Sequence, residues 1–102
     1  MPLVRDALQR LERELALARN EKTKLLKLVH GYGSTGAGGD IRIAVQKRLA
    51  EMTQIGHIRG CIFGENWSKS DESACKLLQS QPDLKGDSDL GRHNRGITIV
   101  LL

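Results

Sequence analysis

The sequence is poor in aromatic residues. Tyr32, Phe63 and Trp67 are the only three among 102 residues. Domains that read single-stranded RNA or DNA by base stacking present several aromatic side chains on one sheet, and this chain cannot supply such a surface. If its partner is a nucleic acid, contacts to the sugar-phosphate backbone must dominate, which favours recognition of the shape of a duplex or of a structured strand.

Cysteines and long apolar runs are also scarce. The two cysteines, Cys61 and Cys75, lie fourteen positions apart and form no CxxC pair, so we expect reduced thiols rather than a zinc site or a disulfide framework. No stretch approaches the ~18 apolar residues of a membrane span, and the charges spread through residues 1–20 exclude a secretory signal. A cytoplasmic protein without a membrane segment is therefore expected.

Positive charge, in contrast, is abundant. Sixteen Lys and Arg against twelve Asp and Glu give a net charge of +4. The excess is uneven, because residues 64–89 carry three basic and six acidic side chains, which leaves thirteen basic and six acidic ones elsewhere. A surface of this sign attracts polyanions, so DNA or RNA is the expected class of partner.

Two long helices and three strands are predicted from the hydrophobic pattern. Apolar residues recur every three or four positions over residues 2–18 and again over 41–54. Arg48 is a charged residue within the second set of apolar positions, and its side chain is expected to extend to the edge of that apolar face. Asp40 is the expected N-cap of the same helix. Short apolar and β-branched runs predict strands at 24–30, the first of them buried, and at 57–63 and 96–102.

The stretch 64–95 is polar and interrupts this pattern. Asp71 stands there as a possible N-cap before the apolar positions Leu77 and Leu78, and several helix-breaking residues follow. We predict one short helix within a long connection. The chain 1–102 is then a single α/β domain with helices layered on a sheet, and 64–95 is an insertion before the last strand.

A glycine-rich segment, GYGSTGAGG, occupies residues 31–39 between the first strand and the second helix. Its G-x-G-x-x-G spacing matches the dinucleotide fingerprint, but the acidic residue at the required distance, Glu51, falls inside the second helix. A P-loop is excluded because Ala37 stands where the phosphate-binding Lys is needed. Binding of a small nucleotide is therefore a weaker alternative than a role on nucleic acids.

His30 immediately precedes this glycine segment, at the end of the first predicted strand. Its ring can lie there over the glycine backbone and the start of the second helix, where N–H groups bind phosphate oxygens. An imidazole titrates near neutral pH and can act as an acid or a base. The alternative is that the ring only satisfies a hydrogen bond of the turn.

Four motifs follow one another along the chain: LVRDAL at 3–8, HGYG at 30–33, the helical pattern of 41–49, and NRGITIVL at 94–101. In this order they resemble the small MutS-related (Smr) domain family over nearly the whole chain. The resemblance implies a two-layer βαβαββ sandwich, similar to the C-terminal domain of bacterial translation initiation factor three.

The same resemblance implies a role on nucleic acids, because Smr domains are associated with DNA nicking and RNA endonuclease activity. His30, Gly31 and Gly33 would then form part of the active or binding loop. The family's first strand ends in a D-L-H-G motif that has no counterpart here, so the sheet is expected to lack that strand and His30 to lack a catalytic partner. The insertion 64–95 replaces a much shorter loop, and its acidic charge could shield or select a substrate.

Two functions follow from these residues. One is an endonuclease that nicks DNA or cleaves structured RNA with His30 as the catalytic residue, and the other is a non-catalytic module in which the loop binds nucleic acid as an anion cradle. A divalent cation such as magnesium is an open cofactor, because Asp40 could either hold one or serve only as the helix cap. The residues expected to bind nucleic acid are Gly31, Tyr32, Gly33, Ser34, Thr35 and Gly36 of the loop and the cations Arg42, Lys47, Arg92 and Arg95.

Overall fold

A computed structural model describes residues 4–31 and 36–102 of the protein. Within these residues, no helix has both the length and the apolar character needed to cross a membrane. The elements are the helices α1 (Val4–Asn20), α2 (Gly36–Gln54) and α3 (Glu72–Ser80), the strands β1 (Leu25–Val29), β2 (Gly60–Phe63) and β3 (Ile97–Leu101), and the 3-10 helices η1 (Gly64–Asn66) and η2 (Pro82–Gly86).

The strands form one sheet in the order β1-β3-β2. β3 lies in the centre and pairs antiparallel with both neighbours, so that Val29 lies opposite Ile97 and Phe63 opposite Thr98. β1 and β2 therefore run in the same direction, and both end where β3 begins. A dinucleotide-binding fold is excluded by this topology, because that fold is built from parallel strands paired with one another.

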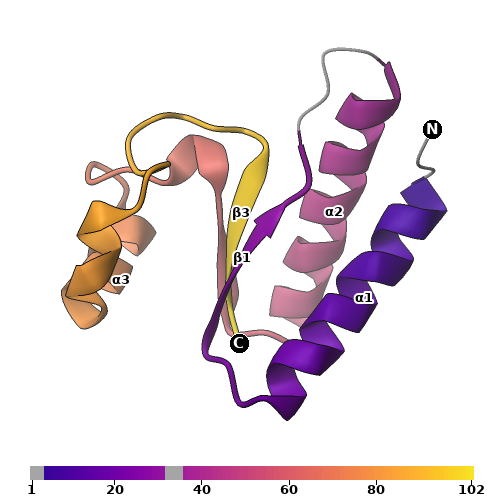
Figure 1. The fold of residues 1–102 in the computed structure, drawn as a ribbon, viewed down its shortest axis with the longest axis horizontal. Helices are drawn as coiled ribbons and strands as arrows, with labels where there is room; N and C mark the ends of the chain where they lie inside the picture. The colour runs from indigo at the N-terminus through magenta and orange to yellow at the C-terminus, as the bar shows by residue number, and fades with distance from the viewer. Residues whose placement is uncertain (1–3, 32–35) are drawn as a thin grey trace.

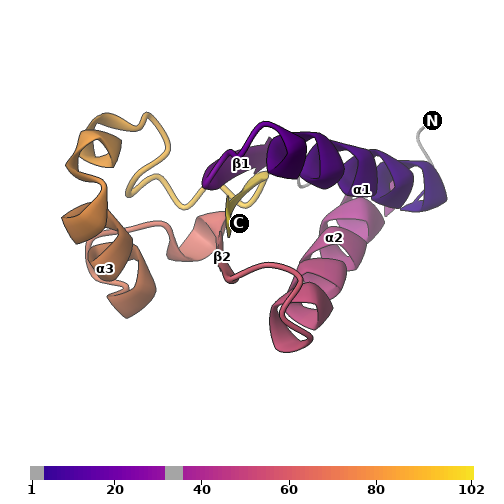
Figure 2. The same ribbon diagram turned by 90° about the horizontal axis from the view of Figure 1, so that it is seen from below.

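α1 and α2 pack against each other and against one face of the sheet (Figures 1 and 2). Leu15, Leu49 and Val100 are completely buried in the cluster between these layers. Burial of each such side chain contributes about 1.5–3 kcal/mol, so this cluster holds both helices on the sheet. Arg48 extends from α2 to Glu12 of α1, with Nη1 2.8 Å from Oε1, which confirms that its charge reaches the rim of the stripe.

The segment 64–95 covers the other face of the sheet. α3 lies on the side away from α1 and α2 in both ribbon views (Figures 1 and 2). Trp67 is completely buried in a second cluster with Leu78, Ile97 and Ile99. The prediction of a two-layer sandwich is therefore incomplete. The apolar residues of this segment form a second core and add a third layer.

Several predicted elements are confirmed. α1 ends at Asn20, and Asp71 is the N-cap of α3, where its carboxylate accepts the Ala74 N–H at 3.0 Å. β3 lies within its predicted range, and β2 is shorter than predicted because residues 57–59 form a bend before it. β1 is present but is not a buried strand: it has a neighbour on one side only, and Val29 is 78% exposed.

The start of α2 differs from the prediction. The helix begins at Gly36, so Asp40 lies inside its first turns and is not the N-cap, and residues 36–39 of the glycine-rich segment belong to the helix. Apolar periodicity marks only the part of a helix that packs on a core, and a glycine-rich first turn carries no such signal. In the described part of the loop, Gly31 has φ +75°, a conformation that favours glycine.

Candidate functional site

The candidate site lies at the end of the sheet where β1 and β2 finish and β3 begins. His30 is the first residue after β1, and its N–H and that of Gly31 both donate to the Gly96 carbonyl, each at 3.0 Å. These two hydrogen bonds extend the pairing of β1 with β3 and fix the backbone of His30. α2 starts a few residues later, so its first turns lie at the same end of the sheet (Figure 1).

Both ring nitrogens of His30 are engaged within the protein. Nδ1 lies 2.7 Å from the Gly31 carbonyl oxygen, which can only accept, so Nδ1 carries the proton. The Nε2 lone pair then accepts from the Thr98 hydroxyl at 2.9 Å. Because Thr98 is completely buried, this second contact is an interior one. The structure thus shows the hydrogen-bonded turn that was the alternative to a catalytic role.

The surroundings of His30 favour its neutral form. Burial lowers the pKa of the imidazole below its ordinary value of 6.5, and the positive charge of Arg42 lowers it further. The hydrogen bond to Gly31 and the negative charge of Glu65 act in the opposite direction without restoring it. At neutral pH the ring is therefore uncharged, and it adds no positive charge to the site.

We expect His30 to make the protein less stable below pH 6.5. Since the folded pKa is lowered, the contribution of His30 to stability is complete above the unfolded value of 6.5 and is lost as the pH falls through the folded value. In urea denaturation at about pH 7.5 and about pH 5.5, His30→Gln, which cannot titrate, should lose less free energy of unfolding than the wild type. Equal losses in the two proteins would show that His30 is not held neutral.

Arg42, Gln46 and Glu65 form a polar cluster beside His30. Arg42 and Gln46 lie one turn apart on α2, and Glu65 follows β2. Arg42 Nη1 lies 3.4 Å from both Glu65 Oε2 and Gln46 Oε1, and Gln46 Nε2 donates to Glu65 Oε1 at 3.2 Å. The fold therefore brings Arg42, among the predicted cations, to His30, together with a carboxylate and an amide that the sequence had not singled out.

Close packing fixes the end of β2 next to this cluster. Gly64 is buried, and a Cβ at its position would lie 1.8 Å from the Asn94 carbonyl oxygen and 2.7 Å from that of Ile97. No side chain fits there, so glycine is required for this approach. The sequence offers no signal for this requirement, because it arises from a loop far along the chain.

The loop before β3 supports the turn that contains Gly64 and Glu65. His93 has a left-handed backbone with φ +55°, which is uncommon outside glycine, and its Nδ1 donates to the Glu65 carbonyl at 3.3 Å. The Asn94 side chain accepts the Gly96 N–H at 2.8 Å and so positions the carbonyl that holds the backbone after β1. His93 and Asn94 are positioning residues that were not predicted, although both stand in the polar sequence that precedes the last strand.

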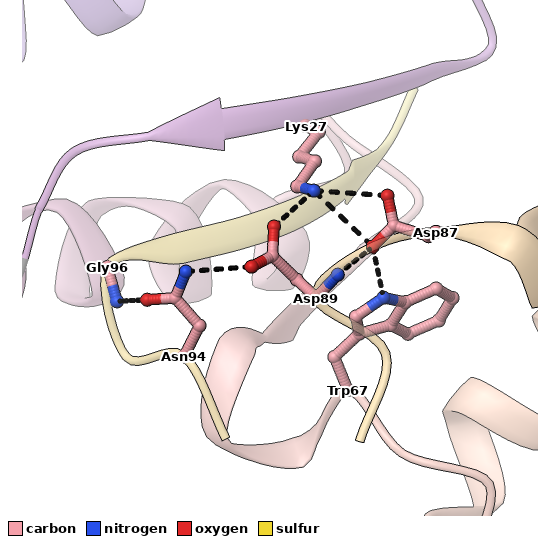
Figure 3. A network of polar contacts seen from close by, with 6 residues as sticks. All are labelled: Lys27, Trp67, Asp87, Asp89, Asn94 and Gly96. Atoms are coloured by element: carbon pink, nitrogen blue, oxygen red, sulfur yellow. Dashed lines mark hydrogen bonds and ion pairs between the residues drawn. The ribbon is translucent and has the colours of Figure 1, made fainter. Parts of the chain in front are cut away.

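An acidic network anchors this loop from the α3 side of the sheet (Figure 3). Lys27 of β1 pairs with Asp87 at 3.0 Å and with Asp89, and the Trp67 indole N–H donates to Asp87 Oδ2 at 2.9 Å. Asp89 accepts from Asn94 Nδ2 at 2.9 Å, and its hydrogen bonds to Asn94 and Lys27 lower its pKa. A continuous set of contacts thus links β1, the buried indole and the backbone of the candidate site.

The other predicted binding residues are dispersed. Residues 32–35 lie outside the described ranges, and Gly36 is the first residue of α2. Lys47, Arg92 and Arg95 are exposed, and the charge of Arg92 acts on the acidic network. In the part of the chain that the structure describes, no hydrogen bond or ion pair joins these three cations to His30.

A groove runs from His30 along the free edge of β1. It has a volume of about 540 Å³ and lies between α1, β1 and α2. Apolar side chains of the two helices and the strand line it together with charged residues of α1. The groove reaches His30, whereas Arg42, Gln46 and Glu65 are not among its lining residues. The lining residues include Arg10, Glu14, Leu26, Leu28, His30 and Ile41.

Across residues 4–31 and 36–102, no three His, Cys, Asp or Glu side chains are grouped as metal ligands, so neither Asp40 nor His30 belongs to such a group. Cys61 and Cys75 are free. Burial raises the pKa of the Cys61 thiol, which keeps it in its less nucleophilic form.

Comparison of the chain with known protein families, curated proteins and solved structures found no match. The resemblance to the Smr domain therefore stays a prediction from the sequence motifs.

Proposed function

We propose that this protein is an Smr-like nucleic-acid-binding domain that contacts phosphate groups at the His30 end of the sheet. The observation that carries the proposal is the position of Arg42, a half-buried guanidinium beside His30 on the helix that begins in the glycine-rich segment of the sequence. Guanidinium groups bind phosphate oxygens through paired hydrogen bonds, and helix N-termini attract anions. The net charge of +4 adds a long-range attraction for polyanions.

The hydrogen bonds of His30 favour binding over cleavage. A general acid or base must present a nitrogen to the substrate, whereas Nδ1 of His30 is bound to Gly31 and Nε2 to Thr98. The imidazole supports the turn in this state and leaves the contact with phosphate to Arg42 and its neighbours. A non-catalytic binding module is therefore the first candidate.

Endonuclease activity is the second candidate, and the cluster around Arg42 is the observation in its favour. The charges of Arg42 and Glu65 both act on His30, so the three groups share one site. A carboxylate, an imidazole and a guanidinium are groups that can activate a nucleophile, protonate a leaving oxygen and stabilise a phosphorane. For this chemistry His30 would have to exchange its contact with Thr98 for one with the substrate.

We expect Arg42→Ala to weaken binding of a labelled stem-loop RNA about tenfold at low salt, because one phosphate contact is lost. The slope of log affinity against log salt concentration should decrease by about one unit. Fluorescence anisotropy at several salt concentrations measures both quantities. Arg13→Ala is the matched control, since Arg13 is an exposed cation of α1, and a loss of the same size in this variant would show that only net charge matters.

Cleavage assays separate the two candidates. Supercoiled plasmid and labelled stem-loop RNA are incubated with the wild type and with His30→Ala, with and without a chelator. A binding module gives no product with either protein, and His30→Ala still binds the RNA. Product that disappears in His30→Ala would replace the binding module with an endonuclease, and the chelator would then show whether magnesium is required.

A further inference from the structure

Arg42 already has an anionic partner inside the protein. Arg42 Nη1 lies 3.4 Å from Glu65 Oε2, and Gln46 Nε2 lies 3.2 Å from Glu65 Oε1. Each oxygen of one carboxylate is thus held by its own donor, and the two donors stand one turn apart on α2. Two non-bridging oxygens of a phosphate group could be bound by the same pair of donors.

We propose that Glu65 is an internal competitor at the phosphate site, and that nucleic acid binds Arg42 and Gln46 by displacing the Glu65 carboxylate. The inference rests on the proposed function and specifies how the same site is regulated. It also gives one acidic residue of the segment 64–95 a defined effect on ligand binding.

The contacts of Glu65 are weak enough to be exchanged. Charge-assisted N–H···O bonds at full strength are about 2.7–2.9 Å long, whereas those of Glu65 measure 3.2 and 3.4 Å. Arg42 Nη1 is also shared with Gln46 Oε1 at 3.4 Å. The Arg42 and Glu65 side chains are 22% and 31% exposed, so solvent and ligand can reach the pair, and partly exposed ion pairs add little net stability.

Only the side chain of Glu65 has to move. The Glu65 carbonyl accepts from His93 Nδ1 at 3.3 Å, and the preceding Gly64 is packed against the Asn94 and Ile97 carbonyls. The backbone of the turn is therefore fixed. Rotation about the side-chain bonds of Glu65 between staggered conformers would release Arg42 while the sheet stays in place.

His30 should report which anion occupies the site. Its pKa is lowered first by burial and then by the charge of Arg42, and the charge of Glu65 raises it. Removal of the Glu65 charge should lower the pKa of His30 further, and a bound phosphate should raise it again because a negative charge returns to the same place. The ring signals of His30 in NMR spectra therefore follow the exchange.

The test uses the whole chain with inorganic phosphate as the probe. Glu65→Gln keeps the size of the side chain and removes its charge. Glu72→Gln is the matched control, because it removes the same charge from α3, where the side chain is 86% exposed and pairs only weakly with Lys76 at 3.5 Å. From His30 ring signals, we expect Glu65→Gln to bind phosphate about two- to fivefold more tightly than the wild type. Glu72→Gln should stay within about 1.5-fold of it.

A second variant tests why the phosphate affinity of Glu65→Gln increases. In a chain that already carries Arg42→Ala, the change Glu65→Gln should bring no increase in phosphate affinity, because the guanidinium that it frees is absent. Three results would overturn the proposal: phosphate affinity in Glu65→Gln that equals or falls below the wild type, no phosphate binding by this variant, or a gain that persists without Arg42. The first would show that Glu65 orients Arg42 instead of competing for it.

The same variants are then titrated with labelled stem-loop RNA. An increase in RNA affinity in Glu65→Gln, with none in Glu72→Gln, is the expected result. The variants could show the expected order of phosphate affinities while none of them binds RNA. That result would contradict the proposed function and leave the competition at Arg42 established.

Discussion

Gly64→Ala should destabilise the protein by at least about 3 kcal/mol, a large part of the ~5–15 kcal/mol that keeps a domain folded. The added methyl group would lie 1.8 Å from the Asn94 carbonyl oxygen and 2.7 Å from that of Ile97. The first is a backbone atom of the loop before the central strand and the second belongs to the first residue of that strand, so neither can move without disturbing the pairing around His30. Urea denaturation measures the change in the free energy of unfolding.

Gly86→Ala is the control for this prediction. No atom lies within 4 Å of a Cβ built at Gly86, so the same chemical change should alter the free energy of unfolding by no more than about 0.5 kcal/mol. Similar small changes in both variants would contradict the close approach at Gly64.

Lys27→Met should reduce the free energy of unfolding by about 2 kcal/mol at neutral pH. The change leaves Asp87 and Asp89, whose side chains are 18% and 20% exposed, facing each other without a cation. Loss of one partner from a fully buried ion pair costs about 3–5 kcal/mol, and the partial exposure of this network reduces that value. Lys69→Met, at an exposed lysine, is the control and should change stability by no more than about 0.5 kcal/mol.

The difference in the free energy of unfolding between Lys27→Met and the wild type should be smaller at low pH. Burial works to raise the pKa of Asp87, but its hydrogen bonds to Trp67 and Lys27 outweigh burial and lower it, and the pKa of Asp89 is also lowered. The stability that these carboxylates contribute is present above the unfolded value of 3.8 and is lost as the pH falls through the folded values. Urea denaturation at about pH 7 and about pH 3 should therefore show a smaller gap between variant and wild type at the lower pH. A gap of the same size at both pH values would mean that Lys27 acts by packing and not through its charge.

The elements that could be predicted from the sequence are those whose determinants are local. The apolar stripe of α1 and the cap of α3, in which Asp71 and Ala74 are three positions apart, lie within one or two helical turns. The prediction for the start of α2 was wrong because a local determinant is missing there. Its first turn, from Gly36 to Asp40, is glycine-rich and has no apolar face, so nothing local distinguishes it from a loop.

The candidate site could be predicted only in part. The place of His30 after a strand and before the glycine-rich segment was readable from the pattern. Its contact with Thr98, the approach of Glu65 to Arg42 and the space that only Gly64 fits all join segments far apart in the sequence. These contacts depend on strand order and register, which no local motif encodes.

The acidic charge of the segment 64–95 also has a more specific role than the sequence suggested. Asp87 and Asp89 are used within the fold, where they neutralise Lys27 of β1. Glu65 instead stands at the candidate site, where it is paired with Arg42. One part of the acidic charge is thus used within the fold, and another part is paired with the cation of the candidate site.

Whether nucleic acid binds at the His30 end of the sheet is tested most directly by NMR mapping of backbone amides. The isotope-labelled chain is titrated with an unlabelled stem-loop RNA. The largest shifts are expected at Gly31, Arg42 and Glu65, whereas Lys24 and Arg59, exposed cations that precede β1 and β2 at the opposite end of the sheet, should change little. Shifts centred on Lys24 and Arg59, or spectra unchanged at saturating RNA, would contradict the proposal.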